Sequence, residues 1–572
     1  MLKGILVSAI DPTIDPIIDP TIERERCLIP LNPKPLRLMI PPMNNAIALK
    51  NKILQISKPA YITQTNGQLS FSTREEALLS SPERNISSPS KIAFLPAIGL
   101  ENLGDKAFKQ RHGLTYPYIA GAMANGISSA QMVKTMAENG MMGFLGAGGL
   151  SLEKIEENII ELKHSLKEKP FGFNLIHSLG DPDHEMATVR LYLKHQIRLI
   201  SAAAFMRMTL PLVYYRVKGI FRDNTQEIIT PNRIIAKVSR IEIARQFFAP
   251  PPEKLVNQLL SSGLITREEA DLSQEIPMAQ DLTAEADSGG HTDNRPALTL
   301  LPTMIGLKNQ FMEIYHYTTP LCVGMAGGIA TPESAAAAFG MGAAYILTGS
   351  INQSCVEADI CEDVKKLLCQ AEQADVAMAP AADMFEIGAR VQVLKRGTLF
   401  PVRAEKLYQL YKTHGCFEEI NERSRQEVEE KFLLTGFEQA WQSTRQFFEN
   451  QGNPKEIQRA QTDPKHKMAL VFRSYLGQSS RWAINGIPQR KMDYQIWCGP
   501  SIGAFNQWVK GSFLEGHANR KTAEVALNLL FGACLCTRAS FLRTQGIELP
   551  LELTTFKPLP KQELLSLISM DS

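Results

Sequence analysis

The sequence predicts an α/β protein built on a closed (β/α)8 barrel, with a helical insertion and a helical C-terminal domain. Between about residues 116 and 375, eight short apolar runs alternate with helix-like stretches, which is the pattern that a closed barrel of parallel strands requires. After Val376 the alternation stops and long helical patterns follow. An open doubly wound sheet shares the alternation, but its Gly-x-Gly-x-x-Gly turn after the first strand is absent, so the barrel is favoured.

The predicted strands are short apolar runs bounded by turn residues. They are Tyr118–Ala122, Met142–Gly146, Phe171–Leu175, Arg198–Ala204, Arg233–Val238, Leu282–Ala286, Leu321–Met325 and Ala344–Thr348. An apolar and aromatic stretch from Phe205 to Phe221 interrupts this rhythm, so we expect an insertion over about 205–232. Three prolines at 250–252 open a second, helical insertion, Glu253–Glu275, within about 250–278.

Helix-like periodicity fills the spaces between the strands and dominates the C-terminal part. The helices expected in the barrel are Ser129–Asn139, Leu152–Leu166, Glu185–Lys194, Ile241–Phe248, Leu298–Tyr315 and Pro332–Phe339. Those expected in the C-terminal domain, 376–572, are Glu405–Lys412, Asn421–Leu434, Glu438–Gln451 and Thr522–Arg543. Aromatic residues cluster after residue 480; they indicate either packing on the barrel or a docking surface for a larger partner.

The N-terminal residues differ from the rest. A repeat of Asp-Pro every four residues from Asp11 to Pro20 excludes a helix or a central strand, so 1–58 is predicted to be a disordered leader. A small hairpin is expected in 59–115, from Ala60–Thr63 and Leu69–Ser72 around an Asn66-Gly67 turn.

Length and composition limit the possible functions. With 572 residues, 44% of them hydrophobic and 21% charged, the chain is typical of a soluble globular protein with more than one core. A net charge of +2 gives no reason to expect nucleic acid or a membrane surface as partner. We find no apolar run long enough to span a bilayer. Nine cysteines without a Cys-x-x-Cys pair indicate a reduced, cytoplasmic protein.

The stretch Glu285–Arg295 is the strongest candidate for a catalytic element. It follows the sixth predicted strand, turns at Gly289 and Gly290, and then presents His291, whose imidazole can move protons near neutral pH. Barrel enzymes place their catalytic residues at such strand ends. Two adjacent glycines also leave room for something large and flat against the main chain.

Glycines after the seventh and eighth strands predict a phosphate site. Gly327-Gly328 and Gly349-Ser350 lie on the two loops that commonly bind phosphate in barrels of this kind. Thr331 and Pro332 make a favourable start for the helix that follows. The alternative is that these glycines only shape the barrel rim.

Small residues at other strand ends predict a planar cofactor, such as a flavin, over the barrel mouth. Gly121, Ala122 and Met123 follow the first strand and leave volume there. Asn174 could bind a pyrimidine edge, and Lys237 could lie near a ring position that becomes negative on reduction. Taken singly, Asn174 equally suits a role in satisfying loop backbone, and Lys237 one as an exposed strand-end charge. His177 and His184 lack a carboxylate or thiolate cluster in register, so no metal site is expected.

Several of these motifs resemble the flavin-dependent nitronate monooxygenase and enoyl-acyl-carrier-protein reductase superfamily. They are Gly121–Gly126, Pro170–Leu175, Glu285–His291 and Ala326–Ala330. The match is closest to the PfaD branch, the trans-acting enoyl reductases of polyunsaturated fatty acid and polyketide synthases, through Ala286–Pro296, Thr348–Gln353, Asp463–Leu470, Tyr494–Pro500 and Trp508–Gly511. The chain departs from the wider superfamily at Gly121-Ala122-Met123, usually Ala-Pro-Met, and at Gly349-Ser350-Ile351, usually Gly-Thr-Arg.

The resemblance implies an FMN-binding TIM barrel over 116–375 and reduction of an enoyl thioester. NADPH or NADH would reduce FMN, and the hydride would pass to an α,β double bond carried on acyl carrier protein domains of a multidomain synthase. His291 would polarise the thioester carbonyl or deliver the α-proton, with Asp287 or Asp293 as candidates for holding its ring. The missing Arg implies that the flavin phosphate relies on backbone N–H groups, the helix dipole and Ser350. A homodimer is possible. The alternatives are nitronate oxidation and a non-catalytic carrier-protein docking subunit.

Overall fold

The computed structural model describes residues 50–65, 68–72, 91–177, 182–450, 454–547, 549–550 and 554–569. Most of the predicted leader and its Asp-Pro repeat lie outside these residues, as does the predicted Asn66-Gly67 turn. Residues 50–54 are helical although they fall within the predicted leader.

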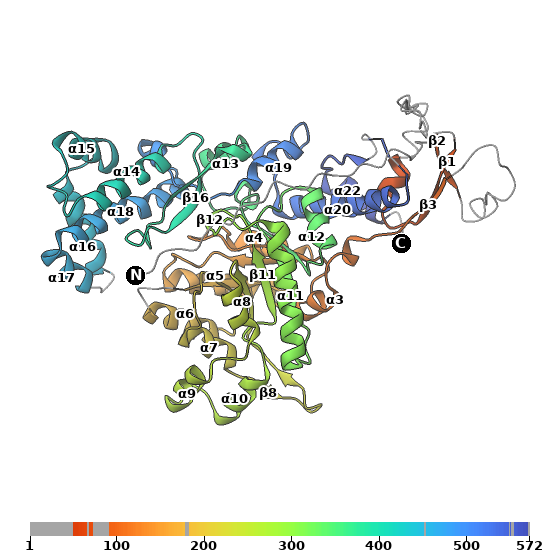
Figure 1. Ribbon diagram of the computed structural model, residues 1–572, viewed down its shortest axis with the longest axis horizontal. Coiled ribbons are helices and arrows are strands. Elements are labelled where there is room, and N and C mark those ends of the chain that lie inside the picture. Colours follow the sequence, from red (N-terminus) through yellow and green to blue (C-terminus); the bar gives the residue numbers. More distant parts are fainter. Residues whose placement is uncertain are drawn as a thin grey trace, which may run out of the picture.

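Eight parallel strands form a closed barrel at the centre of the molecule (Figure 1) in the order β10-β11-β13-β14-β4-β5-β6-β7. They are β4 (Tyr118–Ala120), β5 (Met142–Leu145), β6 (Gly172–Ile176), β7 (Leu199–Ala203), β10 (Arg233–Val238), β11 (Asp281–Glu285), β13 (Cys322–Ala326) and β14 (Ile346–Thr348). All eight predicted strands are present, and the predicted bounds of β10 are met at both ends. The predicted barrel is confirmed.

Helices cover the outside of the barrel. They are α4 (Ala130–Glu138), α5 (Leu152–Leu166), α6 (Pro182–Lys194), α7 (Leu210–Val217), α8 (Ile241–Phe248), α11 (Ala297–Tyr315) and α12 (Pro332–Gly340). Helix α3 (Lys106–His112) precedes the first strand and lies at the barrel floor, and α13 (Glu362–Cys369) follows the last strand. Ser129 and Ser151 cap α4 and α5 by accepting hydrogen bonds from backbone N–H groups of the first turn. Sequence reasoning missed α7, because this helix is buried on most sides and therefore lacks a polar stripe.

The two insertions predicted in the barrel are short. The first contains α7 and the hairpin of β8 (Phe221–Arg222) and β9 (Ile228–Ile229). The second contains α9 (Glu253–Ser261), α10 (Arg267–Leu272) and the 3-10 turn η3 (Ser273–Glu275), as its helical pattern predicted. A capping box between Thr266 and Glu269 starts α10.

The C-terminal region is mostly helical but begins with strands that the sequence did not predict. Strands β15 (Val376–Pro380) and β16 (Arg390–Leu394) form an antiparallel hairpin, and β16 also pairs with β12 (Gly290–His291). The C-terminal region is largely helical, as predicted, and this hairpin is an exception that the sequence did not reveal. Figure 1 shows β12 and β16 between the barrel and the helices to one side of it.

The helices after the hairpin form two groups in Figure 1. The group on one side contains α14 (Phe400–Thr413), α15 (Glu422–Glu427), the π-helical η6 (Val428–Leu433), α16 (Phe437–Asn450), α17 (Pro454–Thr462) and α18 (Pro464–Asn485). After η7 (Pro488–Asp493) come α19 (Ser501–Val509), α20 (Thr522–Thr544) and α22 (Lys561–Ser569). The 22-residue α18 was not predicted, because serines and Gly477 interrupt its periodic pattern.

Helix α20 packs between the barrel and a small N-terminal sheet. A Cβ added at Gly532 would lie 2.5 Å from Cγ of Pro332, so α20 approaches α12 closely. The sheet has the order β2-β1-β3, with β1 (Ala60–Thr65), β2 (Gln68–Ser72) and β3 (Lys91–Leu95), which confirms the predicted hairpin. Gln545, just after α20, donates from Nε2 to the carbonyl of Phe94 at 2.8 Å.

By length and a mean hydropathy of 1.6, α20 is apolar enough to cross a membrane, contrary to the expectation that no such run exists. However, 78% of its most apolar window is buried inside the protein. A helix that is apolar on all sides and buried is typical of a protein core.

A buried charge cluster closes the floor of the barrel. Asp281, the first residue of β11, is 1% exposed, and its Oδ2 lies 2.8 Å from Nε2 of His112. Oδ1 of the same carboxylate accepts a hydrogen bond from Arg111. Burial alone would raise the pKa of Asp281, but the charges of Arg111 and His112 hold it below its ordinary value.

Candidate active site at the barrel mouth

Apart from Asn174, the predicted site residues lie at or near the carboxyl ends of barrel strands, where barrel enzymes build their sites. Gly121, Ala122 and Met123 come after β4, Asn174 lies within β6, and Lys237 is the penultimate residue of β10. Gly289, Gly290 and His291 lie between β11 and α11; Gly327 and Gly328 follow β13; Gly349 and Ser350 follow β14. The fold therefore gathers residues more than 200 positions apart around one mouth.

The loops after β13 and β14 combine open space with unpaired donors. A Cβ added at Gly328 or Gly349 would meet no atom within 4 Å. Within the described ranges, the backbone N–H groups of Gly328, Gly349 and Ser350 donate to no protein acceptor. Backbone N–H groups that point into open space beside glycines suit a phosphate. The residues present therefore fit the phosphate of a flavin nucleotide.

Gly327 has a different role from its neighbour. Its φ is +81°, and an added Cβ would lie 2.7 Å from the carbonyl carbon of Ala286. A side chain at this position would collide with the main chain that follows β11. Gly327 thus lets the loop after β13 pack against the loop that carries His291.

The loops after β4, β5 and β6 contact each other closely. Gly121 donates from its N–H to the carbonyl of Thr348 at 2.9 Å, which ties the first loop to the last strand. A Cβ at Gly146 would lie 1.7 Å from the carbonyl oxygen of Met123. Glycine at 146 is therefore required by the path of the first loop. Ala122 and Met123 are both half-buried beside this contact.

Asn174 is buried, and its side chain serves loop backbone. Its Oδ1 accepts from the N–H of Ala147 at 2.6 Å and from that of Gly148 at 3.2 Å. The Nδ2 group donates no hydrogen bond to the part of the chain that the structure describes. The backbone role weighed for Asn174 is therefore present, and one amide donor is left for a ligand.

Lys237 is held by a carboxylate rather than standing alone. Its Nζ lies 2.6 Å from Oε1 of Glu285, and Ser288 donates to the same oxygen at 3.0 Å. The Lys237 side chain is 27% exposed. This pair joins the end of β10 to the end of β11, where the loop with His291 begins.

The glycine turn at 289–290 packs against the C-terminal region. A Cβ added at Gly289 would lie 2.6 Å from Cα of Cys498, so the space predicted there for a flat ligand is filled by protein backbone. Gly499 donates from its N–H to Oγ of Ser350 at 3.0 Å. Gly290 has a φ of +76°, which confirms the sharp turn. Burial raises the pKa of the Cys498 thiol to about 12, so this thiol is not a nucleophile at neutral pH.

His291 lies in β12 and faces the hairpin from the C-terminal region. Its backbone pairs with Val391 of β16, and its Nε2 lies 3.1 Å from Oδ1 of Asp383 in the loop between β15 and β16. The imidazole is 44% exposed. None of the other predicted site residues makes a hydrogen bond to this ring within the described ranges.

Neither carboxylate predicted to hold His291 does so. Asp287 accepts at Oδ1 from Nδ2 of Asn294 at 2.8 Å and from Nε2 of Gln392 at 2.7 Å. Asp293 binds Arg240 at 3.0 Å, and this hydrogen bond holds the pKa of the Asp293 carboxyl below its ordinary value. The prediction failed because both residues are close to His291 in sequence but point to other partners.

Sequence reasoning therefore missed the residues that reach the site from outside the barrel. Asp383 and Gln392 come from the hairpin, and the segment 497–499 comes from before α19. The segment 497–499 could have been identified from the sequence, because it falls within the Tyr494–Pro500 motif. Asp383 could not, since a single Asp in a loop has no distinguishing pattern.

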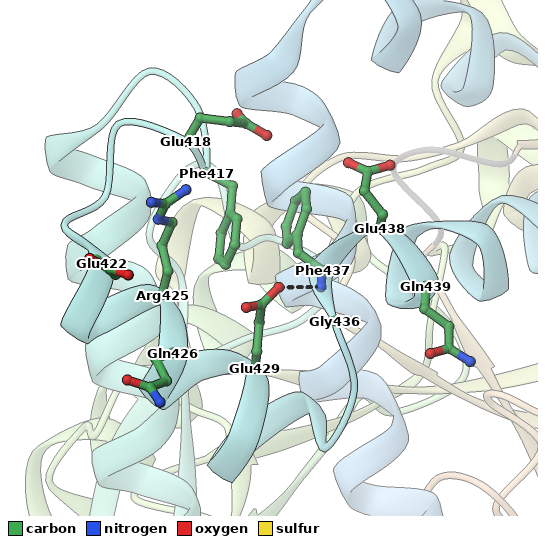
Figure 2. A pocket seen from close by; sticks show the side chains of 10 residues that line it. All are labelled: Phe417, Glu418, Glu422, Arg425, Gln426, Glu429, Gly436, Phe437, Glu438 and Gln439. Carbon is green, nitrogen blue, oxygen red and sulfur yellow. Dashed lines mark hydrogen bonds between the residues drawn. The ribbon is translucent and has the colours of Figure 1, made fainter.

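A separate hollow of about 570 Å³ lies in the helical group at one side of the molecule (Figure 2). Phe417 and Phe437 stack at its base with ring centroids 4.0 Å apart. Glutamates 418, 422, 429 and 438 and one arginine, Arg425, line it. This acidic lining is unsuited to a flavin phosphate, so the barrel mouth remains the candidate active site. Among the described residues no group of three His, Cys, Asp or Glu side chains is placed to hold a metal.

Two family models match adjoining parts of the chain. Residues 106–413 match nitronate monooxygenase, and this match covers the barrel and the hairpin that holds His291. Residues 414–494 match the inserted helical domain of [acyl-carrier-protein] S-malonyltransferase. The second match begins where α14 ends and includes α15 to α18.

Named relatives are similar over most of the chain. A polyunsaturated fatty acid synthase subunit of Thraustochytrium sp. is 41% identical over 87% of the chain and 33% of its own length. Polyketide biosynthesis protein PksE of Bacillus subtilis is 46% identical over 76% of the chain and 56% of its own length. The chain thus spans 33% and 56% of the length of these two relatives.

One solved structure is similar in both sequence and fold. The enoyl reductase domain of MlnA, from the macrolactin biosynthesis cluster of Bacillus amyloliquefaciens, is 40% identical with a TM-score of 0.74. The similarity covers 78% of this chain and 100% of that domain. It therefore extends beyond the barrel into the C-terminal region.

Proposed function

We propose that the chain is an FMN-dependent reductase of enoyl thioesters carried on acyl carrier protein. The premise is its family: the chain belongs to the nitronate monooxygenase family, and within it to the trans-acting enoyl reductases of polyunsaturated fatty acid and polyketide synthases. The electron donor would be NADPH or NADH, and the protein would act in the cytoplasm. The observation that carries the proposal is the set of unpaired N–H groups beside open glycines after β13 and β14.

These groups suggest how the chain would hold FMN. Gly328, Gly349 and Ser350 would donate to the phosphate, and Ser350 keeps its hydroxyl proton for this because its oxygen accepts from Gly499. The free Nδ2 of Asn174 would donate to an oxygen of the ring system. Lys237 would place a partly compensated positive charge on the same side of the mouth.

Bound FMN would supply hydride transfer: two electrons and one proton from NAD(P)H go to the β-carbon of the enoyl thioester. The chain's own task is then to supply one proton to the α-carbon and to stabilise charge on the thioester oxygen. His291 is the group at the mouth that suits this role, because an imidazole both donates and regains a proton near neutral pH. It would act on the substrate directly or through a water molecule.

The carrier protein as partner rests on the relatives. Two of them are named as subunits or proteins of fatty acid and polyketide synthesis. The family model over residues 414–494 is named for an enzyme that uses an acyl carrier protein. A thioester on a carrier protein is therefore the proposed substrate, and a homodimer is proposed as a possible assembly.

The replacement His291→Ala tests the proposed role of this residue. The variant should still bind FMN, because His291 is separate from the phosphate loops, but enoyl reduction should fall by about 10²–10⁴-fold, the usual contribution of proton transfer. FMN binding is measured by flavin fluorescence titration and reduction by oxidation of NADPH with an enoyl thioester. Full activity in the variant would rule out the role of His291.

Nitronate oxidation is the second candidate, because the barrel matches the nitronate monooxygenase family model. The FMN-loaded protein should reduce an enoyl thioester with NADPH and should oxidise a nitronate slowly or not at all. Rapid nitronate oxidation without enoyl reduction would reverse this assignment. Failure of the purified protein to bind FMN would favour a non-catalytic docking subunit.

A further inference from the structure

The loop between β15 and β16 brings Asp383 against His291. We propose that Asp383 is the positioning residue of His291 and that it leaves Nδ1 of the ring as the nitrogen that acts on the substrate. This inference rests on the proposed function, because it assigns a partner to a residue that is catalytic only if that function is correct.

The main chain around His291 is fixed by the hairpin. Residues Gly290 and His291 pair with Gln392 and Val391 of β16. Nε2 of Gln392 also donates to the carbonyl of Ser288 at 2.8 Å and to Oδ1 of Asp287 at 2.7 Å. With the backbone held on both sides, only the side-chain rotation of His291 remains to be set.

Asp383 sets that rotation through a single hydrogen bond. Its Oδ1 lies 3.1 Å from Nε2 of His291. An ionised carboxylate only accepts hydrogen bonds, so Nε2 must carry a proton. In a neutral ring Nδ1 is then the bare nitrogen. When the ring carries a second proton, that proton is on Nδ1, and it is the one that passes to the α-carbon, which leaves Nδ1 bare again. Nδ1 has no partner among the residues that the structure describes, so it is free to meet the substrate.

The carboxylate is itself oriented and kept ionised. The N–H of Met384 donates to Oδ1 of Asp383 at 3.0 Å. Neighbouring protein atoms displace water from Asp383, which by itself would raise its pKa. The hydrogen bond and charge of His291 outweigh this effect and hold the pKa below its ordinary value. Asp383 therefore remains an acceptor at neutral pH.

The helical region holds this loop in place. Phe385, two residues after Asp383, is fully buried, with its ring centroid 5.4 Å from that of Tyr408 and 5.2 Å from that of Tyr411, both on α14. Arg473 of α18 donates from Nε to the carbonyl of Ala382 at 2.9 Å and pairs with Glu386 at 3.1 Å. Both flanks of Asp383 are thus attached to helices outside the barrel, and a rigid support of this kind is what a positioning residue needs.

The tautomer of His291 is a direct readout. In the full chain loaded with FMN and labelled with ¹⁵N-histidine, long-range ¹H–¹⁵N spectra should show His291 with its proton on Nε2; the His291→Ala spectrum identifies the signal. In Asp383→Ala this preference should be lost, giving a mixture of tautomers. Enoyl reduction should fall at least about tenfold, a part of the 10²–10⁴ of proton transfer, while FMN affinity stays unchanged. Asp383→Glu should restore part of both.

Glu386→Gln is the matched control, because it removes the charge of a carboxylate in the same loop that does not contact His291. Its amide oxygen can still accept from Arg473, and the hydrogen bond from Arg473 to Ala382 remains, so the loop stays attached. This variant should leave the His291 tautomer unchanged. A neutral His291 ring with its proton on Nδ1 in the unmodified protein, or an unchanged His291 signal in Asp383→Ala, would overturn the inference. If the tautomer responds as expected but the unmodified protein does not reduce an enoyl thioester, the positioning role stands and the proposed function fails.

Discussion

The contacts within the barrel mouth differ from those that reach it from the C-terminal region. Within the mouth, loops of neighbouring strands hold one another, as Gly121 does with Thr348 and Asn174 with Gly148. The loop with His291 is instead held by residues about 90 to 210 positions later, namely Asp383, Gln392 and Cys498. The barrel loops thus supply the N–H groups suited to a cofactor phosphate, with one contact from Gly499 to Ser350. The geometry of the proposed proton donor, in contrast, depends on both regions.

The largest effect is expected at the barrel floor, at the end of the strands opposite the mouth. Replacing Asp281 by Asn leaves Arg111 and His112 without their carboxylate, and breaking a buried pair in this way costs about 3–5 kcal/mol. The measurement is chemical unfolding followed by circular dichroism. If the free energy of unfolding fell by less than about 0.5 kcal/mol, as is typical of a surface site, the buried ion pair of Asp281 would be contradicted.

The free energy of unfolding of Asp281→Asn should also depend on pH differently from that of the unmodified protein. The folded-state pKa of Asp281 lies below its ordinary value of 3.8. Its contribution is therefore complete above that pH and is lost as pH falls through the folded-state pKa. The difference in stability between the protein and Asp281→Asn should shrink only at pH values below about 4.

A core substitution in the helical group tests whether the two regions are separable. Phe417 is 5% exposed and stacks on Phe437, so Phe417→Ala should cost about 3–5 kcal/mol. FMN affinity should not change, because the N–H groups suited to a phosphate belong to the barrel loops. Phe447→Ala is the control on α16, since that side chain is 46% exposed and should cost less than about 0.5 kcal/mol.

The junction of the two regions should respond to Gly289→Ala. The new methyl group would lie 2.6 Å from Cα of Cys498, and overpacking against backbone costs about 1–3 kcal/mol. Enoyl reduction should fall while FMN remains bound, because the shifted loop carries His291. Gly306→Ala is a matched glycine control in α11, where an added Cβ meets nothing within 4 Å. Equal stability and equal enoyl reduction in the two variants would contradict the close contact between Gly289 and Cys498.

The smallest effect on folding is expected from Gly349→Ala. No atom lies within 4 Å of the added Cβ, so thermal stability should be unchanged. If a phosphate approaches this backbone, the methyl group should weaken FMN binding by about tenfold, or 1.4 kcal/mol. Unchanged FMN affinity would show that the phosphate does not bind at the loop after β14.

Much of the barrel was predictable because the bounds of its strands and helices depend on residues that are close together in the sequence. The bounds of β10, α5 and α8 follow from apolar periodicity and, for α5, from the cap Ser151. The same local reading places the site residues at the strand ends, because strand order alone determines where they meet.

The remainder depends on pairings between distant segments. Strand β12 is two residues long and exists because it pairs with β16, about 100 positions later. No pattern around Gly290 specifies that partner, and for the same reason Asp383 was missed while Asp287 and Asp293 were preferred. Helix α7 was misread as an interruption because burial on most sides removes the polar stripe that identifies a surface helix.

The central claim is that this barrel, completed by the C-terminal region, reduces enoyl thioesters. The most direct measurement is anaerobic mixing of the FMN-loaded, NADPH-reduced protein with an enoyl thioester on acyl carrier protein, followed by flavin absorbance and mass spectrometry of the carrier. We expect the flavin to be reoxidised while the carrier gains two hydrogens, and His291→Ala to slow this step without loss of flavin. Flavin that stays reduced with the thioester but is reoxidised on addition of oxygen would contradict the claim.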